Sequence, residues 1–312
     1  MQTGTSRYRN LALFVLLAAL WGTSFMVTKV GLRNIPPVLF AALRFDLGAI
    51  LLFGYVAAKG LRWRPRTRSE WSLVAVGGVF MIGAHHALLF TGQQYVTSAV
   101  AAVLLGLVPV LTPALSRLFL ADERLSPLGV AGILVGFAGV WIIASPDPAN
   151  LLSANLRGVE LVLLSAIVFA LGAVLTHRNR TSLPTASMQA WMLLVGAVML
   201  HVASLLLPGE AIADVVWGSE TFAAIGYMGV VAGVVGYFMY FTLLSRLGPI
   251  EMSLIEYVIP VFAAVSGWLA LGETVRAGTV TGFVVIFVGF VLVKRRALAR
   301  EVEGVRASIT SR

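Results

Sequence analysis

Long apolar stretches separated by short polar turns run through almost the whole of the 312-residue chain. A helix needs about 20 mostly apolar residues to cross the hydrocarbon core of a bilayer. Proline, glycine and clustered charges divide the sequence into ten segments near that length, which we place at residues 11–31, 38–58, 71–91, 97–119, 127–145, 158–177, 186–207, 220–243, 250–271 and 277–294. The pattern therefore predicts an all-α integral membrane protein with ten transmembrane helices.

Composition agrees with a chain whose solvent is lipid. Hydrophobic residues make up 59% and charged residues 12%, whereas about a quarter of the residues of a soluble domain are charged. The chain contains no Cys, which excludes disulfides and Cys-ligated metal sites, and we expect neither a metal nor a cofactor. The first apolar stretch is too long for a secretory signal and lacks a convincing cleavage site, so we interpret it as a retained helix.

Basic residues show how the helices are oriented. The net charge is +9, but Lys and Arg flank the apolar segments instead of clustering beside a nucleic-acid-binding motif, so we expect no nucleic-acid partner. One side of the predicted membrane holds 18 of these residues and the other side 3. Positive loops stay in the cytoplasm, so we expect residues 1–10, the basic tail at 295–312 and both termini to lie inside a plasma (inner) membrane.

An internal repeat divides the chain into two units, 11–145 and 157–294. Val108-Pro109-Val110 matches Ile259-Pro260-Val261 at a separation of 151. Six residues then recur at a separation of 150, namely Glu123, Val130, Gly132, Val135, Phe137 and Gly139 as Glu273, Val280, Gly282, Val285, Phe287 and Gly289. Five helices per unit is an odd number, so the second copy must be inverted. Inverted repeats are a recurring architecture of secondary transporters, with the solute site near the midplane between them.

Several short motifs recur in the order and spacing of a known family. They are Leu20-Trp21-Gly22-Thr23-Ser24-Phe25 followed by Lys29, Leu43-Arg44-Phe45, Pro109-Val110, Asp122-Glu123-Arg124-Leu125, Tyr257-Val258-Ile259-Pro260-Val261 and Leu271-Gly272-Glu273. From about residue 10 to 294 the chain resembles the EamA-like permeases of the drug/metabolite transporter superfamily. The resemblance implies transport of small metabolites such as amino acids, often as export and often assumed to be driven by protons.

Ionisable residues inside apolar segments are functional candidates, because placing one at the bilayer centre costs about 2.5–3.5 kcal/mol on insertion scales. Glu256 lies one turn before Pro260, which has no amide hydrogen to donate to the carbonyl of Glu256. Its carboxylate is a candidate for binding a cationic solute group or a coupling proton. A structural pair with an Arg or a Tyr, or a side chain that reaches the cytoplasmic interface, is the alternative.

Two adjacent histidines, His85 and His86, fall in the third segment and titrate near neutral pH, which suits proton relay. Adjacent helical positions point about 100° apart, so we expect at most one of them to face a solute cavity. A buried histidine bonded to a backbone carbonyl is the structural alternative.

Four charged residues lie in the outer half of the predicted bundle: Lys29, Arg44, Asp46 and Glu160. Arg44 and Asp46 project from nearly opposite helix faces, so their partners must come from other helices. Lys29, Glu160 and the two histidines are available at a similar depth. The four residues form either an extracellular gate network or structural ion pairs.

Prolines, aromatic residues and glycines complete the set of candidates. Pro109 and Pro260 are candidate hinges or static kinks. Aromatic rings that line an amphipathic pocket can stack with a cationic solute, or else pack against neighbouring helices; the candidates are Trp21, Tyr237, Tyr240 and Tyr257. Glycines at 129, 132, 136 and 139 recur at helical spacing and predict a groove for another helix.

A secondary carrier that works by alternating access is the function these observations favour. No P-loop or H-E-x-x-H motif occurs, so a nucleotide-driven pump and a zinc protease are disfavoured and we expect no enzyme. A lipid or headgroup flippase, or a non-transporting receptor, is the alternative for the same fold. The expected partners are a small-molecule substrate, the lipid bilayer and, as a candidate, a second copy of the chain.

Overall fold

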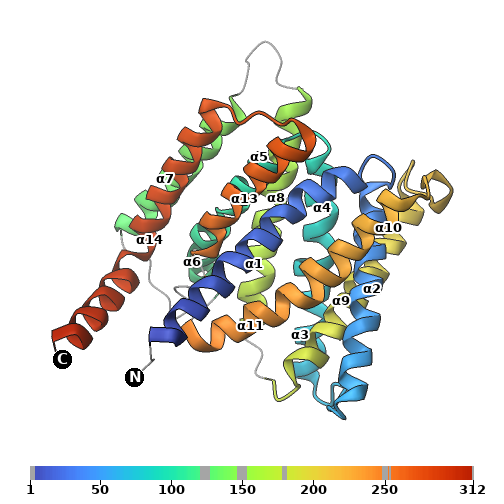
Figure 1. The fold of residues 1–312 in the computed structure, drawn as a ribbon, viewed down its shortest axis with the longest axis horizontal. Coiled ribbons are helices and arrows are strands. Elements are labelled where there is room, and N and C mark those ends of the chain that lie inside the picture. Colours follow the sequence, from blue (N-terminus) through green and yellow to red (C-terminus); the bar gives the residue numbers. More distant parts are fainter. Residues whose placement is uncertain are drawn as a thin grey trace.

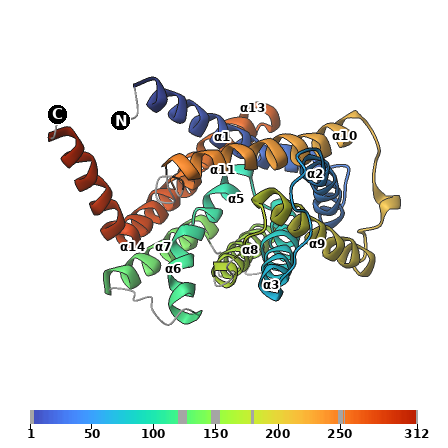
Figure 2. The same cartoon turned by 90° about the horizontal axis from the view of Figure 1, so that it is seen from below.

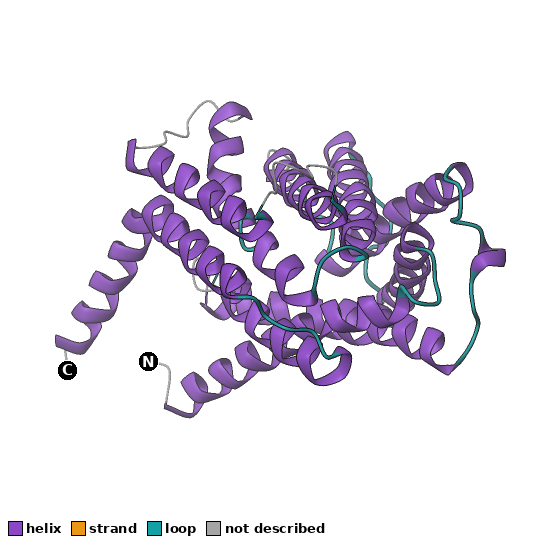
Figure 3. Ribbon diagram, turned by 90° about the horizontal axis from the view of Figure 1, so that it is seen from above, coloured by secondary structure: helices purple, strands orange, loops and turns teal. Residues whose placement is uncertain are grey.

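The computed structural model describes residues 4–119, 127–145, 153–177, 181–247, 252 and 254–310. All regular structure in these ranges is helical (Figure 3). Nine helical stretches within them are long and apolar enough to cross a membrane, and α13 (Ile255–Leu271) is a shorter apolar helix of 17 residues. The predicted all-helical membrane class is therefore confirmed, with nine candidate spans and one shorter helix at the places of the ten predicted segments.

The first unit folds into five segments, two of which are interrupted (Figure 1). In chain order the elements are α1 (Gly4–Gly31), α2 (Pro37–Ala58), α3 (Arg68–Val76), the π-helix η1 (Gly77–Ala84), α4 (His85–Gln93), α5 (Ser98–Leu105), α6 (Val108–Phe119) and α7 (Pro127–Ala144). The third segment is α3, η1 and α4 in continuous succession, and the fourth is α5 and α6.

The second unit repeats this order of elements. Its helices are α8 (Ala154–His177), α9 (Thr185–Leu206), the short η2 (Ile212–Asp214), α10 (Ser219–Gly226), the π-helix η3 (Tyr227–Val235), α11 (Gly236–Leu247), α13 and α14 (Ala277–Thr310). Glu123 of the repeat and residues 248–251, where the ninth segment was predicted to begin, lie outside the described residues. The N and C marks lie at the same end of the molecule in Figures 1 and 2.

Capping groups at several helix starts satisfy amides that have no partner within the helix. Thr67 accepts the amide of Glu70 at the start of α3, and Thr97 accepts the amide of Val100 at the start of α5. At the start of α2, the carboxylate of Glu210 accepts the amides of two successive residues, Val38 and Leu39. Burial raises the pKa of Glu210, which lies in the loop after α9.

The two π-helices are an unpredicted feature that recurs at the spacing of the repeat. η1 begins at Gly77 and η3 at Tyr227, 150 residues later. A π-helix has wider turns than an α-helix and often marks a functional site. The corresponding segments of the two units therefore share an irregularity of the backbone as well as residue types.

Helices α7 and α14 cross in close contact through their glycines, side by side at one edge of the bundle (Figures 1 and 2). A Cβ added at Gly132 would lie 2.7 Å from the carbonyl oxygen of Gly289, and one added at Gly139 would lie 2.7 Å from that of Gly282. Gly132 thus meets the repeat partner of Gly139, and Gly139 meets the repeat partner of Gly132. This exchange is the contact pattern that a twofold axis generates, and it confirms the predicted groove on α7.

We expect Gly139→Ala to destabilise the protein, because the added methyl group would press on the backbone of α14. Overpacking of this kind costs about 1–3 kcal/mol. Gly54→Ala, in α2, is the matched control, since a Cβ there meets open space and alanine favours a helix over glycine. Thermal unfolding in detergent measures both variants. Equal midpoints for Gly139→Ala and the wild type would show that the crossing is not tightly packed.

Candidate functional site

Two interrupted segments meet inside the bundle, where α5 and α6 contact α13. The fourth segment breaks between Leu105 and Val108, and in the ninth segment α13 begins at Ile255. The hydroxyl of Tyr257 donates a hydrogen bond to the carbonyl of Gly106, at 2.9 Å. Broken helices that line the interface between repeats are the usual places for solute and ion sites in secondary transporters. This crossing is therefore the first candidate site.

Glu256 lies in the first turn of α13, at the crossing. A Cβ at Gly22 of α1 would lie 2.7 Å from the carbonyl oxygen of Ile259, so the two helices touch one turn beyond Glu256. At 1.5 Å per residue, Glu256 lies about 20 Å from the outer end of α1, near mid-depth. The side chain is half-buried and has no hydrogen bond or ion pair within the described ranges. A carboxylate is thus available to a ligand inside the bundle.

An aromatic group stands beside the candidate site. The ring of Trp21 lies 5.7 Å from that of Tyr237 and 5.4 Å from that of Tyr240. Glu256 acts electrostatically on both tyrosines, which places its charge near them. Tyr257 lies apart from this group, because its ring packs against Phe290 at 4.7 Å and its hydroxyl is already hydrogen-bonded. The structure therefore brings together three of the four aromatic candidates.

The two π-helices each offer a carbonyl to a side chain at the same position of the repeat. The Nδ1 atom of His86 lies 3.0 Å from the carbonyl oxygen of Ile82 in η1. In η3, the indole of Trp21 donates to the carbonyl of Ala232 at 3.0 Å. Ile82 and Ala232 are 150 residues apart, so corresponding carbonyls are bound by different donors. In the second unit the donor comes from α1, which ties α1 to η3.

Both histidines are buried and bonded to backbone carbonyls. His85 is 5% exposed and His86 8%. The Nδ1 atom of His85 lies 3.0 Å from the carbonyl oxygen of Ser165 in α8. The two rings contact each other at 4.5 Å, and His86 also contacts Phe45. This geometry matches the structural alternative for a buried histidine, and transport by proton relay through the pair stays a prediction.

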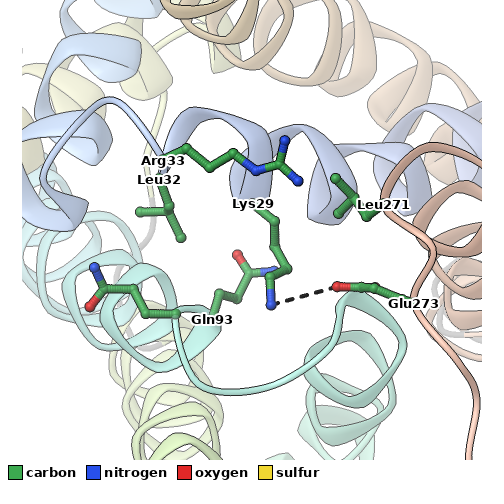
Figure 4. Close-up of a pocket in the computed structure, with 7 residues that line it drawn as sticks. Lys29, Leu32, Arg33, Gln93, Leu271 and Glu273 are labelled. Atoms are coloured by element: carbon green, nitrogen blue, oxygen red, sulfur yellow. Dashed lines mark ion pairs between the residues drawn. The ribbon is translucent and has the colours of Figure 1, made fainter. Parts of the chain in front are cut away.

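A polar cavity of about 390 Å³ opens near the predicted outer ends of α1, α4 and α13 (Figure 4). Lys29 is bound at its wall: its Nζ atom lies 3.5 Å from Oε1 of Glu273 and donates to the carbonyl of Val96 at 2.7 Å. Glu273 in turn accepts the amide of Ser98 at the start of α5, at 2.9 Å. The remaining lining residues are Leu32, Arg33, Gln93, Gln94 and Leu271. The ion pair therefore joins α1, the α5 start and the turn after α13.

The other charged candidates do not gather around Lys29. Asp46 accepts a hydrogen bond from His201 of α9 at 2.7 Å, and both side chains are more than a third exposed. Glu160 is exposed at the start of α8. Arg44 is buried in α2 and lies 4.4 Å from the ring of Phe45. The pairings of Lys29 with Glu273 and of Asp46 with His201 were not predicted, because no sequence spacing encodes contacts between distant helices.

The two prolines occupy different positions. Pro109 is the second residue of α6, directly after the break, where its missing amide hydrogen leaves no gap in the helix. Pro260 lies inside α13, one turn after Glu256. Both stay candidate hinges, with the break at Gly106 as an additional flexible point in the first unit.

Comparison with protein families places the chain. The model of the EamA-like transporter family matches it twice, over residues 9–145 and 156–295. The chain belongs to the EamA-like transporter family. Membership indicates a multi-pass membrane transporter rather than an enzyme.

Relatives in the EamA-like family carry transporter names. The chain is 30% identical to the uncharacterized inner membrane transporter YedA of Escherichia coli (strain K12), over 87% of this chain and 91% of YedA. It is 29% identical to a "Probable amino-acid metabolite efflux pump" of the same strain, over 89% of this chain and 92% of the pump. A solved crystal structure shares the fold, with a TM-score of 0.63, 22% identity and coverage of 93% of this chain and 98% of the other.

We expect the pair of Lys29 and Glu273 to show coupled stability in a double-mutant cycle. Lys29→Met and Glu273→Gln each remove one partner of an ion pair that is mostly buried, at 24% and 12% exposure of the side chains. The coupling free energy should be about 1 kcal/mol, from thermal unfolding in detergent. Glu220→Gln, at the exposed start of α10, should combine additively with Lys29→Met. Additivity in the first cycle would contradict the ion pair.

Proposed function

We propose that the protein is a secondary transporter that exports small metabolites such as amino acids by alternating access, with two inverted five-helix units and coupling to protons. Both termini lie in the cytoplasm in this proposal, and a small-molecule solute binds near mid-depth at the crossing of α5 and α6 with α13. The observation that carries the proposal is the unpaired carboxylate of Glu256 at this crossing.

The exchange of glycine contacts between α7 and α14 supports the inverted arrangement. The contacts of Gly132 with Gly289 and of Gly139 with Gly282 run antiparallel and swap repeat partners. The π-helices in the third and eighth segments support it too, since they begin 150 residues apart. Two halves of the same shape, related by an axis in the membrane plane, have two equivalent ways of packing against each other, one open to each side.

The chemistry at the crossing supports a polar or charged solute. An unpaired carboxylate at mid-depth is costly in hydrocarbon unless a cation or a proton accompanies it. Trp21, Tyr237 and Tyr240 add aromatic faces, which attract ammonium groups. The relative named as an amino-acid metabolite efflux pump supports solutes that carry an ammonium group. The polar cavity beside Lys29 and Glu273 lies towards the predicted outer face and supports a path of release.

We expect purified protein in liposomes to move at least one labelled amino acid from a panel, with faster flux when a proton gradient opposes the solute movement. In Glu256→Gln, whose side chain keeps its shape but cannot ionise, the gradient should no longer accelerate flux, and the rate should fall at least about tenfold, equivalent to about 1.4 kcal/mol. Flux at several pH values measures both effects.

Glu220→Gln is the matched control for the carboxylate variant, because Glu220 is exposed at the start of α10. It should keep the wild-type rate and pH dependence. Flux by a folded Glu256→Gln chain with unchanged pH dependence would remove the role of Glu256, and no flux of any solute by the wild type would overturn the carrier.

We expect a reporter fused after Arg312 to locate in the cytoplasm. Green fluorescent protein fluoresces there, while alkaline phosphatase is inactive there, because charge bias keeps the basic tail inside. A second fusion in the loop before α10, near Trp217, should give the opposite pair of signals. Equal signals at the two positions would contradict the proposed orientation.

A further inference from the structure

Arg44 is a buried cation inside the second segment. Its residue exposure is 7%, and its guanidinium carbon lies 4.4 Å from the ring of Phe45 and 5.3 Å from that of Phe90. Its carbonyl lies against Gly229 of η3, where an added Cβ would approach to 3.0 Å. Arg44 therefore stands where α2 and α4 pack near the π-helix of the eighth segment.

No acidic side chain pairs with Arg44 in the part of the chain that the structure describes. The ion pairs found there join Lys29 with Glu273, Arg62 with Glu70 and His201 with Asp46. The Nε atom of Arg44 is fully buried and lacks a hydrogen-bond partner within the same ranges. Two aromatic rings attract the guanidinium, but rings accept no hydrogen bond in the plane of the guanidinium, where its donors point.

The titratable neighbours of Arg44 supply no negative charge. His85, His86 and Tyr237 are within electrostatic reach of it. In each histidine Nδ1 faces a backbone carbonyl, so Nδ1 carries the hydrogen and a neutral ring keeps its lone pair on Nε2. An unpaired buried charge is strongly destabilising. An anion from outside the chain would remove this cost.

Tyr237 connects this cation with the carboxylate of Glu256. The charges of Arg44 and Glu256 both act on its phenol group, and its ring contacts Trp21. The two unpaired charges of the bundle interior, of opposite sign, therefore flank one aromatic group. A solute with a carboxylate at one end and an ammonium group nearby matches this arrangement.

We propose that Arg44 binds the carboxylate of the transported solute, and that Glu256 faces the ammonium end of the same molecule. This assignment rests on the proposed transport function and adds the substrate class, which is α-amino acids rather than amines. A carboxylate fits because a guanidinium binds it through two parallel hydrogen bonds, and because one cation matches one negative charge. A phosphate dianion would need a second cation, which the described neighbours of Arg44 do not provide.

The test compares amino acids with amines that lack only the carboxylate, in liposomes that contain the purified protein. For phenylalanine and 2-phenylethylamine, and for leucine and 3-methylbutylamine, the wild type should prefer the amino acid at least about tenfold in competition with the labelled transported solute. Arg44→Gln should lose at least about tenfold in amino-acid flux and lose the preference. Arg44→Lys, which keeps the charge without the two-pronged geometry, should keep part of the preference.

Arg157→Gln is the control for the loss of one guanidinium, since Arg157 is exposed at the start of α8; it should keep the preference. Equal effects of Arg44→Gln on amino acid and amine would overturn the assignment while leaving transport intact. If Arg44→Gln does not fold, competition on the wild type decides, and amines that compete as well as amino acids overturn it. Absence of flux for every solute is a different result, which contradicts the carrier itself.

Discussion

Hydrocarbon offers neither hydrogen-bond partners nor a hydrophobic force between apolar helices, and the rest of this structure depends on that constraint. Helices in a bilayer associate through close packing and polar contacts instead. At the crossing of α7 and α14, backbone lies on backbone because Gly132 and Gly289 have no side chains to separate them. Elsewhere, backbone carbonyls freed by irregular turns are bound by side chains, as Ala232 is by Trp21.

The same constraint gives the interrupted segments their meaning. A broken helix exposes backbone groups that lipid cannot satisfy, so breaks are tolerated where protein or a water-filled space surrounds them. In this protein the break at Gly106 is covered by the phenol of Tyr257, and α13 begins close by with Glu256 in its first turn. A carboxylate near a helix start is favoured by the helix dipole. The crossing can therefore hold a charge at mid-depth more cheaply than an uninterrupted helix could.

Much of the fold could be predicted from the sequence, because a span has a fixed minimum length and apolar composition. The predicted segment 38–58 differs from α2 by one residue at its start, and Gly139 was expected at a helix contact. The π-helices were not predicted, since Gly77 and Tyr227 open them without a distinctive local pattern. Pairs between distant helices escaped for another reason: Glu273 meets Lys29 instead of the nearby Arg276 only because three helix ends converge there.

Departures from the repeat concentrate beside the candidate site, and this distribution has a mechanical consequence. His86 in the first unit corresponds to Gly236 in the second, and the indole of Trp21 occupies the space that a side chain at Gly236 would need, with Nε1 at 2.5 Å from an added Cβ. Trp21 can therefore reach the carbonyl of Ala232, while His86 reaches that of Ile82 from its own helix. Two identical halves would favour inward and outward states equally. Because α1 is bonded to η3 in a way that α8 cannot reproduce at η1, with Leu171 at the position of Trp21, the two states must differ in energy, and a solute bound beside Trp21 acts directly on the contact that sets the difference.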